Sequence, residues 1–360
     1  MTSRVVLAYS GGLGSSVALH LLARQAEVIA VVVDFGTGDV DLDAVRRRAV
    51  MAGAAEVAVI PARDEFADRY CLAALQANAV LFGRYPLVAS LARPVLAGHV
   101  VAVAESLCAS AIAHGGDGLF SKTAGDLAPR LHVLEPLSEC AVAADYARAH
   151  GLPTGGPQVS IKRTVWGRGG AAQAPLFSYT ENAAVHADAP DEVVVSFERG
   201  VPIAVDGETV CVTEAVQWLG YRAGAHGIGR FDPAGDGREG YEAPGAAALI
   251  IAHRQLEART LDRDLARFKQ GVDRRWTDLV HDGSWFSPLR EPLDAFIRQA
   301  QERVTGDVRL LLHAGAAAAP GAPETPGAAG RRLRPAGARY RPVTGRNPLG
   351  QAWHPTTQAS

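Results

Sequence analysis

The first strand and turn of this chain constrain its fold more than any other stretch. The apolar run Val5-Val6-Leu7-Ala8 leads directly into Tyr9-Ser10-Gly11-Gly12-Leu13-Gly14-Ser15-Ser16, and a helical pattern follows. The paired glycines allow positive φ and a close approach to a ligand, and the serine hydroxyls stand where the free N–H groups of a helix begin. We therefore predict an anion site that takes phosphate. An ordinary strand-to-helix turn is the alternative, because a single glycine-rich turn has low specificity.

The first 150 residues alternate between strand-like and helix-like patterns. The run 28–33 is almost entirely valine, isoleucine and alanine, which indicates a strand buried on both faces of a parallel sheet. We predict an α/β fold with a doubly wound, mostly parallel sheet, and loops at Ser10, Asp34 and Gly115 that meet beyond the carboxyl ends of its strands. The predicted helices are 15–24, 41–51 with Arg46, Arg47 and Arg48 on the solvent side, 81–99 and 100–109, and the predicted strands are 5–8, 28–33, 56–60, 111–114 and 131–134.

The alternation stops near residue 151, where a glycine- and proline-rich stretch marks a linker. Beyond it we predict a second domain of α+β type. Its predicted strands are 192–197 and 208–213, joined by 200–207, and its predicted helices are 246–262, 265–281 and 288–305. The composition from residue 314 onward is rich in Ala, Gly, Pro and Arg, which is typical of a mobile or disordered tail. The predicted domains are therefore 1–150 and 151–313, followed by the tail 314–360.

Charge and cysteine content exclude several classes of protein. With 36 Lys+Arg against 38 Asp+Glu, the net charge of -2 supplies no global field for nucleic acid or an anionic membrane. The four cysteines are too scattered for a zinc or redox motif and are interpreted as buried thiols in a reducing cytosol. We find no secretory signal, expect no apolar run of membrane-spanning length, and predict a cytoplasmic protein with small-molecule substrates.

Several ordered motifs carry a family resemblance over about residues 4–313. The loop at residues 8–16 resembles the pyrophosphate-binding loop of the N-type ATP pyrophosphatases, an adenine nucleotide alpha hydrolase-like superfamily. Within that superfamily the chain is similar to argininosuccinate synthase. The blocks that carry this similarity are Tyr85–Pro94, Ala113–Gly115, Ala225–Arg230, Gly240–Gly245 and several short motifs between Leu261 and Gly306.

The resemblance implies a two-step ligase that converts ATP, with Mg²⁺, to AMP and pyrophosphate. In that family the ureido oxygen of citrulline attacks the α-phosphorus, and the amine of aspartate then displaces AMP. The implied catalytic residues are Ser10, Ser15 and Ser16. The implied ATP-binding residues are Ala8, Tyr9, Ser10, Gly11, Gly12, Leu13, Gly14, Ser15, Ser16, Val33 and Gly115. The candidate substrate-binding residues are Tyr85, Ser90, Arg93, Asp117, Lys122, Ser160 and Tyr241. A homo-oligomer, by resemblance a tetramer, is also implied.

This chain departs from the family pattern in the ATP-binding loop and in the segments that bind citrulline and aspartate. Gly14 stands where the family loop has aspartate, and Asp34, Asp39 and Asp117 are either replacement carboxylates or ordinary loop-capping residues. The aspartate-binding Asn-Asp pair has no clear counterpart. Gly169 replaces a serine, and the citrulline-binding glutamate is lost unless Asp236 or Glu239 takes its place. The loss of several hydrogen-bond partners argues against citrulline as the substrate.

Two interpretations are open for each of three cationic residues. Arg93 suits a structural or nucleotide-side role, or an ion pair at the end of a helix. Lys122 and Arg168 suit either the binding of an acidic substrate or a solvated surface.

Three functions follow from these observations. The first is a ligase diverged toward a substrate other than citrulline, for example in specialised metabolism. The second is an argininosuccinate synthase of arginine biosynthesis with unusual loops. The third is a nucleotide-binding protein that has lost catalysis.

Overall fold

The N-terminal half is built on a five-stranded parallel sheet. The computed structural model describes residues 3–38, 40–139, 143–153, 156, 158–170, 177–182, 189–231 and 240–318. The strands lie in the order β3-β2-β1-β4-β5, and every neighbouring pair is parallel. Their bounds are β1 Arg4–Ala8, β2 Glu27–Asp34, β3 Glu56–Pro61, β4 Ala111–Ala113 and β5 His132–Leu134. The predicted doubly wound α/β fold is confirmed, with β1 and β4 at the point where the strand order reverses.

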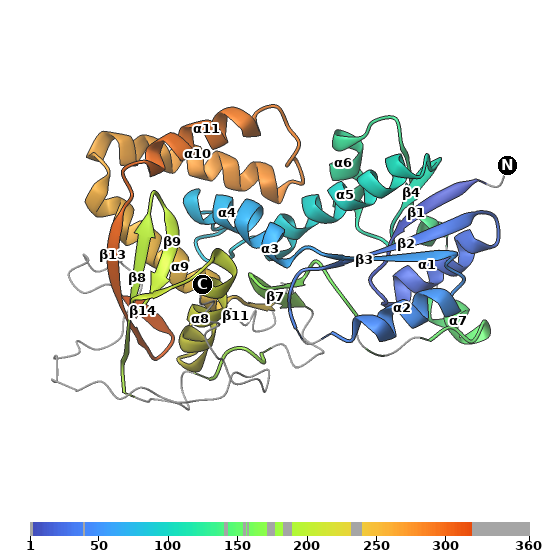
Figure 1. The fold of residues 1–360 in the computed structure, drawn as a ribbon, viewed down its shortest axis with the longest axis horizontal. Coiled ribbons are helices and arrows are strands. Elements are labelled where there is room, and N and C mark those ends of the chain that lie inside the picture. The colour runs from blue at the N-terminus through green and yellow to red at the C-terminus, as the bar shows by residue number, and fades with distance from the viewer. Residues whose placement is uncertain are drawn as a thin grey trace, which may run out of the picture.

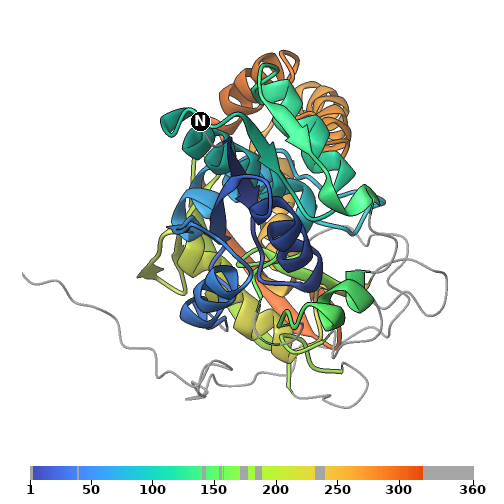
Figure 2. The ribbon, with the colours of Figure 1, turned by 90° about the vertical axis from the view of Figure 1, so that its right-hand side faces the viewer.

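Helices cover both faces of this sheet (Figures 1 and 2). Alternate residues of β1 belong to two different apolar clusters: Leu7 packs in the cluster that also contains side chains of α1, α2 and α7, and Val6 packs in the cluster that contains α5 and α6. This burial on both sides explains the uninterrupted apolar sequence of the strands. The helices are α1 Leu13–Ala23, α2 Leu42–Met51, α5 Val88–Ser106, α6 Gly118–Leu127 and α7 Ala143–Ala149.

The segment before α5 differs from the predicted helix 81–99. Leu81 and Tyr85 form an isolated antiparallel bridge, and Phe82 and Leu87 have positive φ values of 52° and 57°. Pro86 lacks an N–H and restricts the residue before it, so a helix starts only at Val88. The predicted helices 81–99 and 100–109 are therefore one helix. An unpredicted helical stretch comes earlier, formed by α3 Arg63–Glu65, a π-helical turn Phe66–Cys71 and α4 Leu72–Gln76.

The C-terminal half contains a second, antiparallel sheet in the order β10-β9-β8-β13-β14. Three predictions here are wrong. Strand β9 lies inside the predicted connection 200–207. The predicted strand 208–213 ends at Thr209, because α8 begins at Val212, where the Glu214 carboxylate accepts the N–H of Cys211 (2.8 Å). The predicted tail begins too early, because β14 lies beyond His313. The bounds are β8 Asp191–Glu198, β9 Val201–Val205, β10 Glu208–Thr209, β13 Gly306–His313, β14 Ala316–Ala318 and α8 Val212–Ala225.

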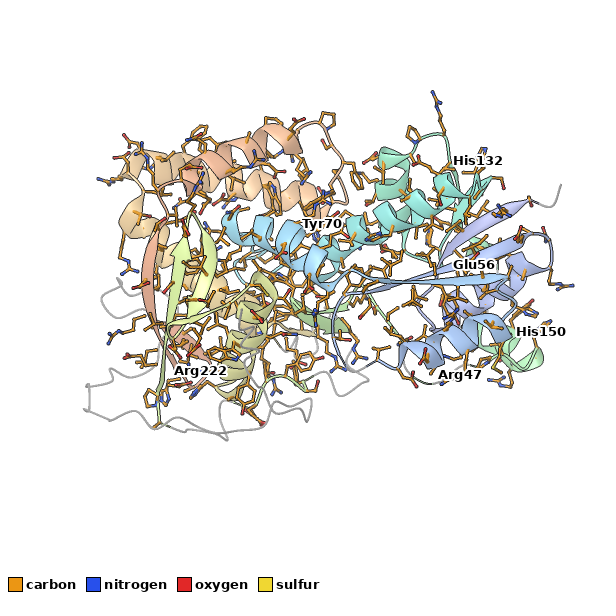
Figure 3. All side chains as sticks on the ribbon, viewed as in Figure 1. Arg47, Glu56, Tyr70, His132, His150 and Arg222 are labelled. Atoms are coloured by element: carbon orange, nitrogen blue, oxygen red, sulfur yellow. The ribbon has the colours of Figure 1, made fainter. Side chains whose placement is uncertain are left out.

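Three further helices of this half agree with the sequence prediction to within a few residues. They are α9 Pro244–Thr260, α10 Arg263–His281 and α11 Arg290–Gln301. Helix α8 is fixed to the sheet by Arg222, whose Nε donates to Asp191 (2.8 Å) and which Figure 3 labels. A third, small sheet has the order β11-β12-β7-β6. Its strands are β6 Arg163–Thr164, β7 Gly167–Gly170, β11 Arg230–Phe231 and β12 Gly240–Glu242.

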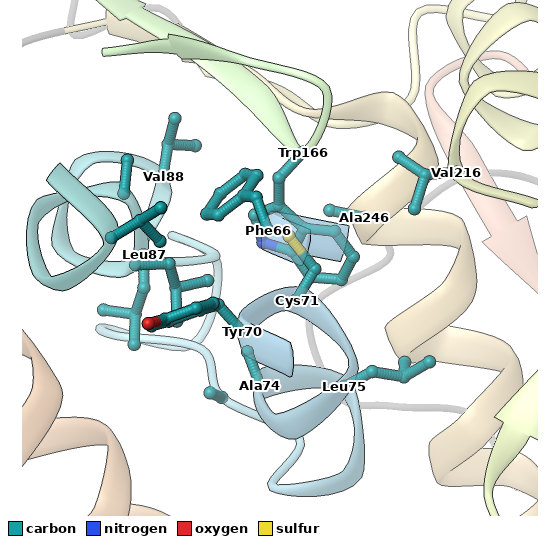
Figure 4. Packing of buried hydrophobic residues seen from close by; sticks show 14 of the residues in the cluster. Phe66, Tyr70, Cys71, Ala74, Leu75, Leu87, Val88, Trp166, Val216 and Ala246 are labelled. Carbon is teal, nitrogen blue, oxygen red and sulfur yellow. The ribbon is translucent and has the colours of Figure 1, made fainter. Parts of the chain in front are cut away.

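One apolar cluster runs through both halves of the chain. Trp166 lies at its centre beside Phe66 and Cys71, with Val216 and Ala246 of the C-terminal helices on the far side (Figure 4). The indole Nε1 of Trp166 donates to the carbonyl of Pro86 (2.8 Å). The small sheet is thus anchored against the start of α5, which brings the two predicted domains into contact.

The cysteine and membrane predictions need correction. Cys71 is buried, and burial raises the pKa of its thiol, but Cys108 and Cys211 are exposed. These two lie at the end of α5 and at the start of α8, where the chain reaches the surface. Cys140 lies outside the described residues. Among the described helices, α5 is long and apolar enough to cross a membrane by length and composition, contrary to the expectation, although 61% of its most apolar window is buried in the protein.

Candidate active site

The predicted anion loop joins β1 to α1 and is held by its own hydroxyls. Gly11 has φ +77°, and Gly12 caps α1, whose first turn contains no acidic residue. Ser10 Oγ accepts the N–H of Gly12 (3.2 Å) and lies 3.0 Å from Ser15 Oγ, which donates to the carbonyl of Gly12 (3.1 Å). The hydroxyl of Tyr9 is 3.0 Å from Ser16 Oγ. The loop therefore presents hydroxyls beside the outward N–H groups of a helix start, an arrangement that binds anions.

The loop after β4 touches this anion loop, as predicted for Ser10 and Gly115. A Cβ placed at Gly115 would lie 2.9 Å from the backbone N of Ser15, and one at Gly14 would lie 3.0 Å from the carbonyl oxygen of Gly115 and 3.1 Å from Leu137 Cδ1. The two backbones therefore approach each other as closely as glycine permits. Ala8 ends β1 and Val33 precedes Asp34, the last residue of β2, and both are buried.

The candidate replacement carboxylates are engaged in local contacts. Asp34 Oδ1 accepts the N–H of Gly36 (2.9 Å). Asp117 caps α6 by accepting the N–H of Leu119 (3.2 Å), and its other oxygen accepts Nε of Arg93 (2.9 Å). Arg93 is only 7% exposed. These contacts favour the capping and ion-pair interpretations of Asp34, Asp117 and Arg93, and Asp39 lies outside the described residues.

Arg48 is a site residue that the sequence interpretation missed. We predicted that Arg46, Arg47 and Arg48 face solvent. Arg47 does, with 68% of its side chain exposed, but Arg48 is only 7% exposed. Its Nη2 lies 2.8 Å from the position that a Cβ at Gly11 would occupy. A guanidinium therefore lies beside the anion loop, where it adds positive charge for a phosphate. The signal that could have found it is the helical spacing, because Arg48 lies three residues after the apolar Val45 and on the same face of α2.

His114, at the end of β4, organises the turn that contains Gly115. Its Nδ1 accepts the N–H groups of Gly116 (3.1 Å) and Asp117 (3.0 Å), so the proton of the neutral ring is on Nε2. Nε2 donates to Ser121 Oγ (2.7 Å), which also bonds the Glu135 carboxylate. Burial lowers the pKa of His114 despite the nearby Glu135 carboxylate.

This geometry predicts that acid weakens nucleotide binding. Because the folded pKa of His114 is below its unfolded value, the stabilisation of the turn is present above the unfolded pKa and is lost as pH falls through the folded pKa. An imidazolium cannot accept the two N–H groups. We expect MgATP affinity to fall several-fold from pH 7.5 to 5.5 by calorimetry, and His114→Asn, whose amide oxygen still accepts, to show a flatter profile. Equal profiles in the two proteins would contradict this role.

Four of the candidate substrate-binding residues, Tyr85, Ser90, Ser160 and Tyr241, lie around the small sheet. The rings of Tyr85 and Tyr241 are 5.0 Å apart in an edge arrangement. Ser160 pairs with Arg163, and the N–H of the preceding Val159 donates to the carbonyl of Ser10 (2.9 Å), which connects this sheet to the anion loop. Ser90 is buried on α5, which packs against β6 and β7.

The two candidate cations have different environments. Lys122 bonds Asp126 (3.4 Å) and Ser284, so it ties α6 to the turn before α11. Arg168 is not a solvated surface residue: its side chain is 14% exposed, bonds Ser178 and lies 4.0 Å from the Glu242 carboxylate. Asp236 and Glu239 lie outside the described residues.

Glu242 is a second residue that the sequence interpretation missed. It is fully buried and accepts hydrogen bonds from the N–H groups of Ser178 and Tyr179 and from the hydroxyl of Thr180, each at 3.0 Å. It therefore fixes the segment 177–182 against the small sheet. Its partners are more than sixty residues away in the sequence, so no local pattern indicates them.

Comparisons with known proteins agree with this architecture. Residues 4–153 match the Arginosuccinate synthase N-terminal HUP domain, and residues 169–324 match the Arginosuccinate synthase C-terminal domain. The fold and the anion loop, together with these matches, define the class as an ATP-dependent ligase with a HUP-type nucleotide domain. The chain belongs to the argininosuccinate synthase family.

A solved structure with a partial match is the NAD+ synthetase from Burkholderia pseudomallei. The two chains are 23% identical, with a TM-score of 0.26. The match covers 35% of this chain and 49% of the synthetase, so this chain spans about half of that protein.

Proposed function

We propose that this chain is an AMP-forming carbon–nitrogen ligase whose acceptor is not citrulline. In the proposed reaction an acceptor oxygen attacks the α-phosphorus of ATP, pyrophosphate leaves, and an amine then displaces AMP. The observation that supports the proposal is the contact between the Ser10–Ser16 loop and Gly115, where backbone N–H groups and hydroxyls lie close together, as an anion site requires. Such donors stabilise the charge that develops on the leaving pyrophosphate.

Magnesium fits this site as part of the MgATP substrate. The described residues contain no cluster of three or more His, Cys, Asp or Glu side chains able to hold a metal. Mg²⁺ in nucleotide sites takes most of its ligands from phosphate and water, with one or two carboxylates from the protein. Glu135 follows β5 at the edge of the sheet where the anion loop lies, so this carboxylate suits that role.

Pyrophosphate release from MgATP is the decisive experiment. The purified chain is assayed with citrulline plus aspartate and, separately, with pools of other acids, ureido compounds and amines. Pyrophosphate release that occurs only with another pool supports the proposal. Release with citrulline and aspartate returns the chain to arginine biosynthesis, a candidate favoured by the proximity of Tyr85 and Tyr241. The absence of pyrophosphate release in every pool, with MgATP still bound, favours a binding protein.

The binding-protein alternative rests on Gly14 and has a direct test. Because a Cβ at this position would lie 3.0 Å from the Gly115 carbonyl oxygen and 3.1 Å from Leu137 Cδ1, Gly14→Asp crowds the contact between the two loops. We expect its pyrophosphate release to be at or below that of the wild type. Gly14→Ala is the matched control, since it adds the Cβ without the charge. Activity that appears only in Gly14→Asp would support loss of catalysis in the natural chain.

A further inference from the structure

The small sheet sorts its side chains into two rows of opposite character. Phe231, Tyr241 and Gly169 lie in register across β11, β12 and β7, and the neighbouring row contains Arg230, Glu242 and Arg168. Successive residues of a strand point to opposite faces, so one face is aromatic and the other is charged.

The charged face is occupied by the protein itself. Glu242 holds Ser178, Tyr179 and Thr180 there, and the guanidinium of Arg230 lies 3.7 Å from the ring centroid of Phe177. This face therefore serves packing, and the aromatic face is the candidate for a ligand, although Tyr241 itself is mostly buried.

On the aromatic face, three rings and one arginine form a continuous wall. Tyr241 lies 5.2 Å from Phe231 at an interplanar angle of 30°, and 5.0 Å from Tyr85 at 64°. The guanidinium of Arg84 lies 3.9 Å from the centroid of Phe231. Burial raises the pKa of Tyr241 to about 12, so its hydroxyl is neutral at physiological pH.

The row of aromatic side chains ends at Gly169, which has no side chain. A Cβ at Gly169, beside Tyr241 in the row, would have only the carbonyl oxygen of Gly240 within 4 Å (at 3.7 Å) among the described residues. The N–H of Gly169 donates to Lys162 (2.7 Å), and Val159 of the same segment bonds Ser10. Because four residues span no more than about 14 Å, this space lies within roughly 20 Å of the anion loop.

We propose that the acceptor is an aromatic carboxylic acid whose ring occupies the space over Gly169, against Tyr241, with its carboxylate toward the anion loop; Phe231 supports Tyr241 from the other side. Aromatic rings attract one another in offset or edge arrangements at 4.5–7 Å, whereas a ureido group needs several hydrogen-bond partners that this row does not provide.

The inference rests on the proposed ligase function, and its chemistry balances without a redox partner. A carboxylate oxygen bonds to the α-phosphorus as the bond to the β-phosphate oxygen breaks, and pyrophosphate leaves with the electron pair. The amine then forms a bond to the carbonyl carbon, AMP leaves, and the nitrogen loses a proton.

A comparison of ring chemistry tests the proposal. We would measure the binding of 4-hydroxyphenylacetate, cinnamate and cyclohexanecarboxylate to the full chain with a non-hydrolysable MgATP analogue, and hydroxamate formation with MgATP and hydroxylamine. We expect the aromatic acids to bind about 3- to 10-fold more tightly than the saturated acid. Phe231→Leu should reduce that preference, because it removes the ring that packs against Tyr241, and Gly169→Val should weaken aromatic binding further. Phe268→Leu, at a 65% exposed position on α10, is the matched control.

The outcomes separate this inference from the proposed function. Equal binding of saturated and aromatic acids, or no effect of Phe231→Leu and Gly169→Val, would overturn the aromatic assignment. Turnover of citrulline with aspartate would overturn it too, yet leave an AMP-forming ligase. Aromatic binding that depends on Phe231 but yields neither hydroxamate nor pyrophosphate would support the ligand assignment and contradict the ligase.

Discussion

Gly115→Ala is expected to lower ATP-dependent turnover strongly while the fold persists. The added Cβ would lie 2.9 Å from the backbone N of Ser15 and 3.1 Å from the backbone C of Gly14. Neither is the end of a flexible side chain, so the two loops must separate. A displacement of about 1 Å in a phosphate-positioning loop costs on the order of 100-fold in rate. The loss of one charge-assisted hydrogen bond, about 1.5–3 kcal/mol, also weakens MgATP binding by roughly tenfold or more.

The matched control is Gly118→Ala in the first turn of α6. A Cβ there has nothing within 4 Å among the described residues, and the φ of Gly118 is not in the left-handed region. MgATP affinity is measured by calorimetry and pyrophosphate release by a coupled assay, both well below the melting temperature of each variant. Gly115→Ala with the affinity and rate of Gly118→Ala would show that the close approach is not needed.

The parallel sheet and the anion loop were predictable because their signals are local. The runs 5–8 and 28–33 are apolar at every position, and a serine and two glycines follow one residue after β1. Such patterns need only nearest neighbours in the chain. The meeting of the loops at Ser10 and Gly115 was predicted from the order of strands and helices, and the structure adds the backbone contact between Gly115 and Ser15.

Elements that depend on distant partners were missed. Strand β9 is short, and its sequence Val201–Val205 contains a proline and follows a glycine, which suggested a connection. Strand β13 pairs with β8, more than a hundred residues earlier, and this pairing is what orders the chain beyond Thr305. Glu242 was missed for the same reason, because its partners lie far away in the sequence.

Lys269→Met is expected to destabilise the protein by about 3–5 kcal/mol, because it leaves two buried carboxylates without their cation. Lys269 of α10 is 1% exposed. Its Nζ donates to Asp273 (2.8 Å) and to the carbonyl of Gln76 (2.7 Å), and it lies 3.0 Å from Glu257 of α9. The residue therefore joins α4, α9 and α10. Lys122→Met is the control, since its ion pair with Asp126 is partly exposed and contributes at most about 1 kcal/mol.

The pH dependence of this loss identifies its electrostatic origin. Burial raises the pKa of Asp273 to about 6 despite Lys269, so its contribution to stability is present below its unfolded pKa and is lost as pH rises through about 6. Burial lowers the pKa of His253 to about 4, with a contribution from the charge of Lys269. The stability that His253 contributes is therefore lost as pH falls through about 4.

Without the positive charge of Lys269, Asp273 and His253 both bind protons more strongly. The deficit of Lys269→Met, measured by urea unfolding, should therefore be largest at pH 7.5 and smaller at pH 5.5. A deficit of the same size at both pH values would point to packing as the cause, and a deficit no larger than that of Lys122→Met would contradict the role of this buried cation.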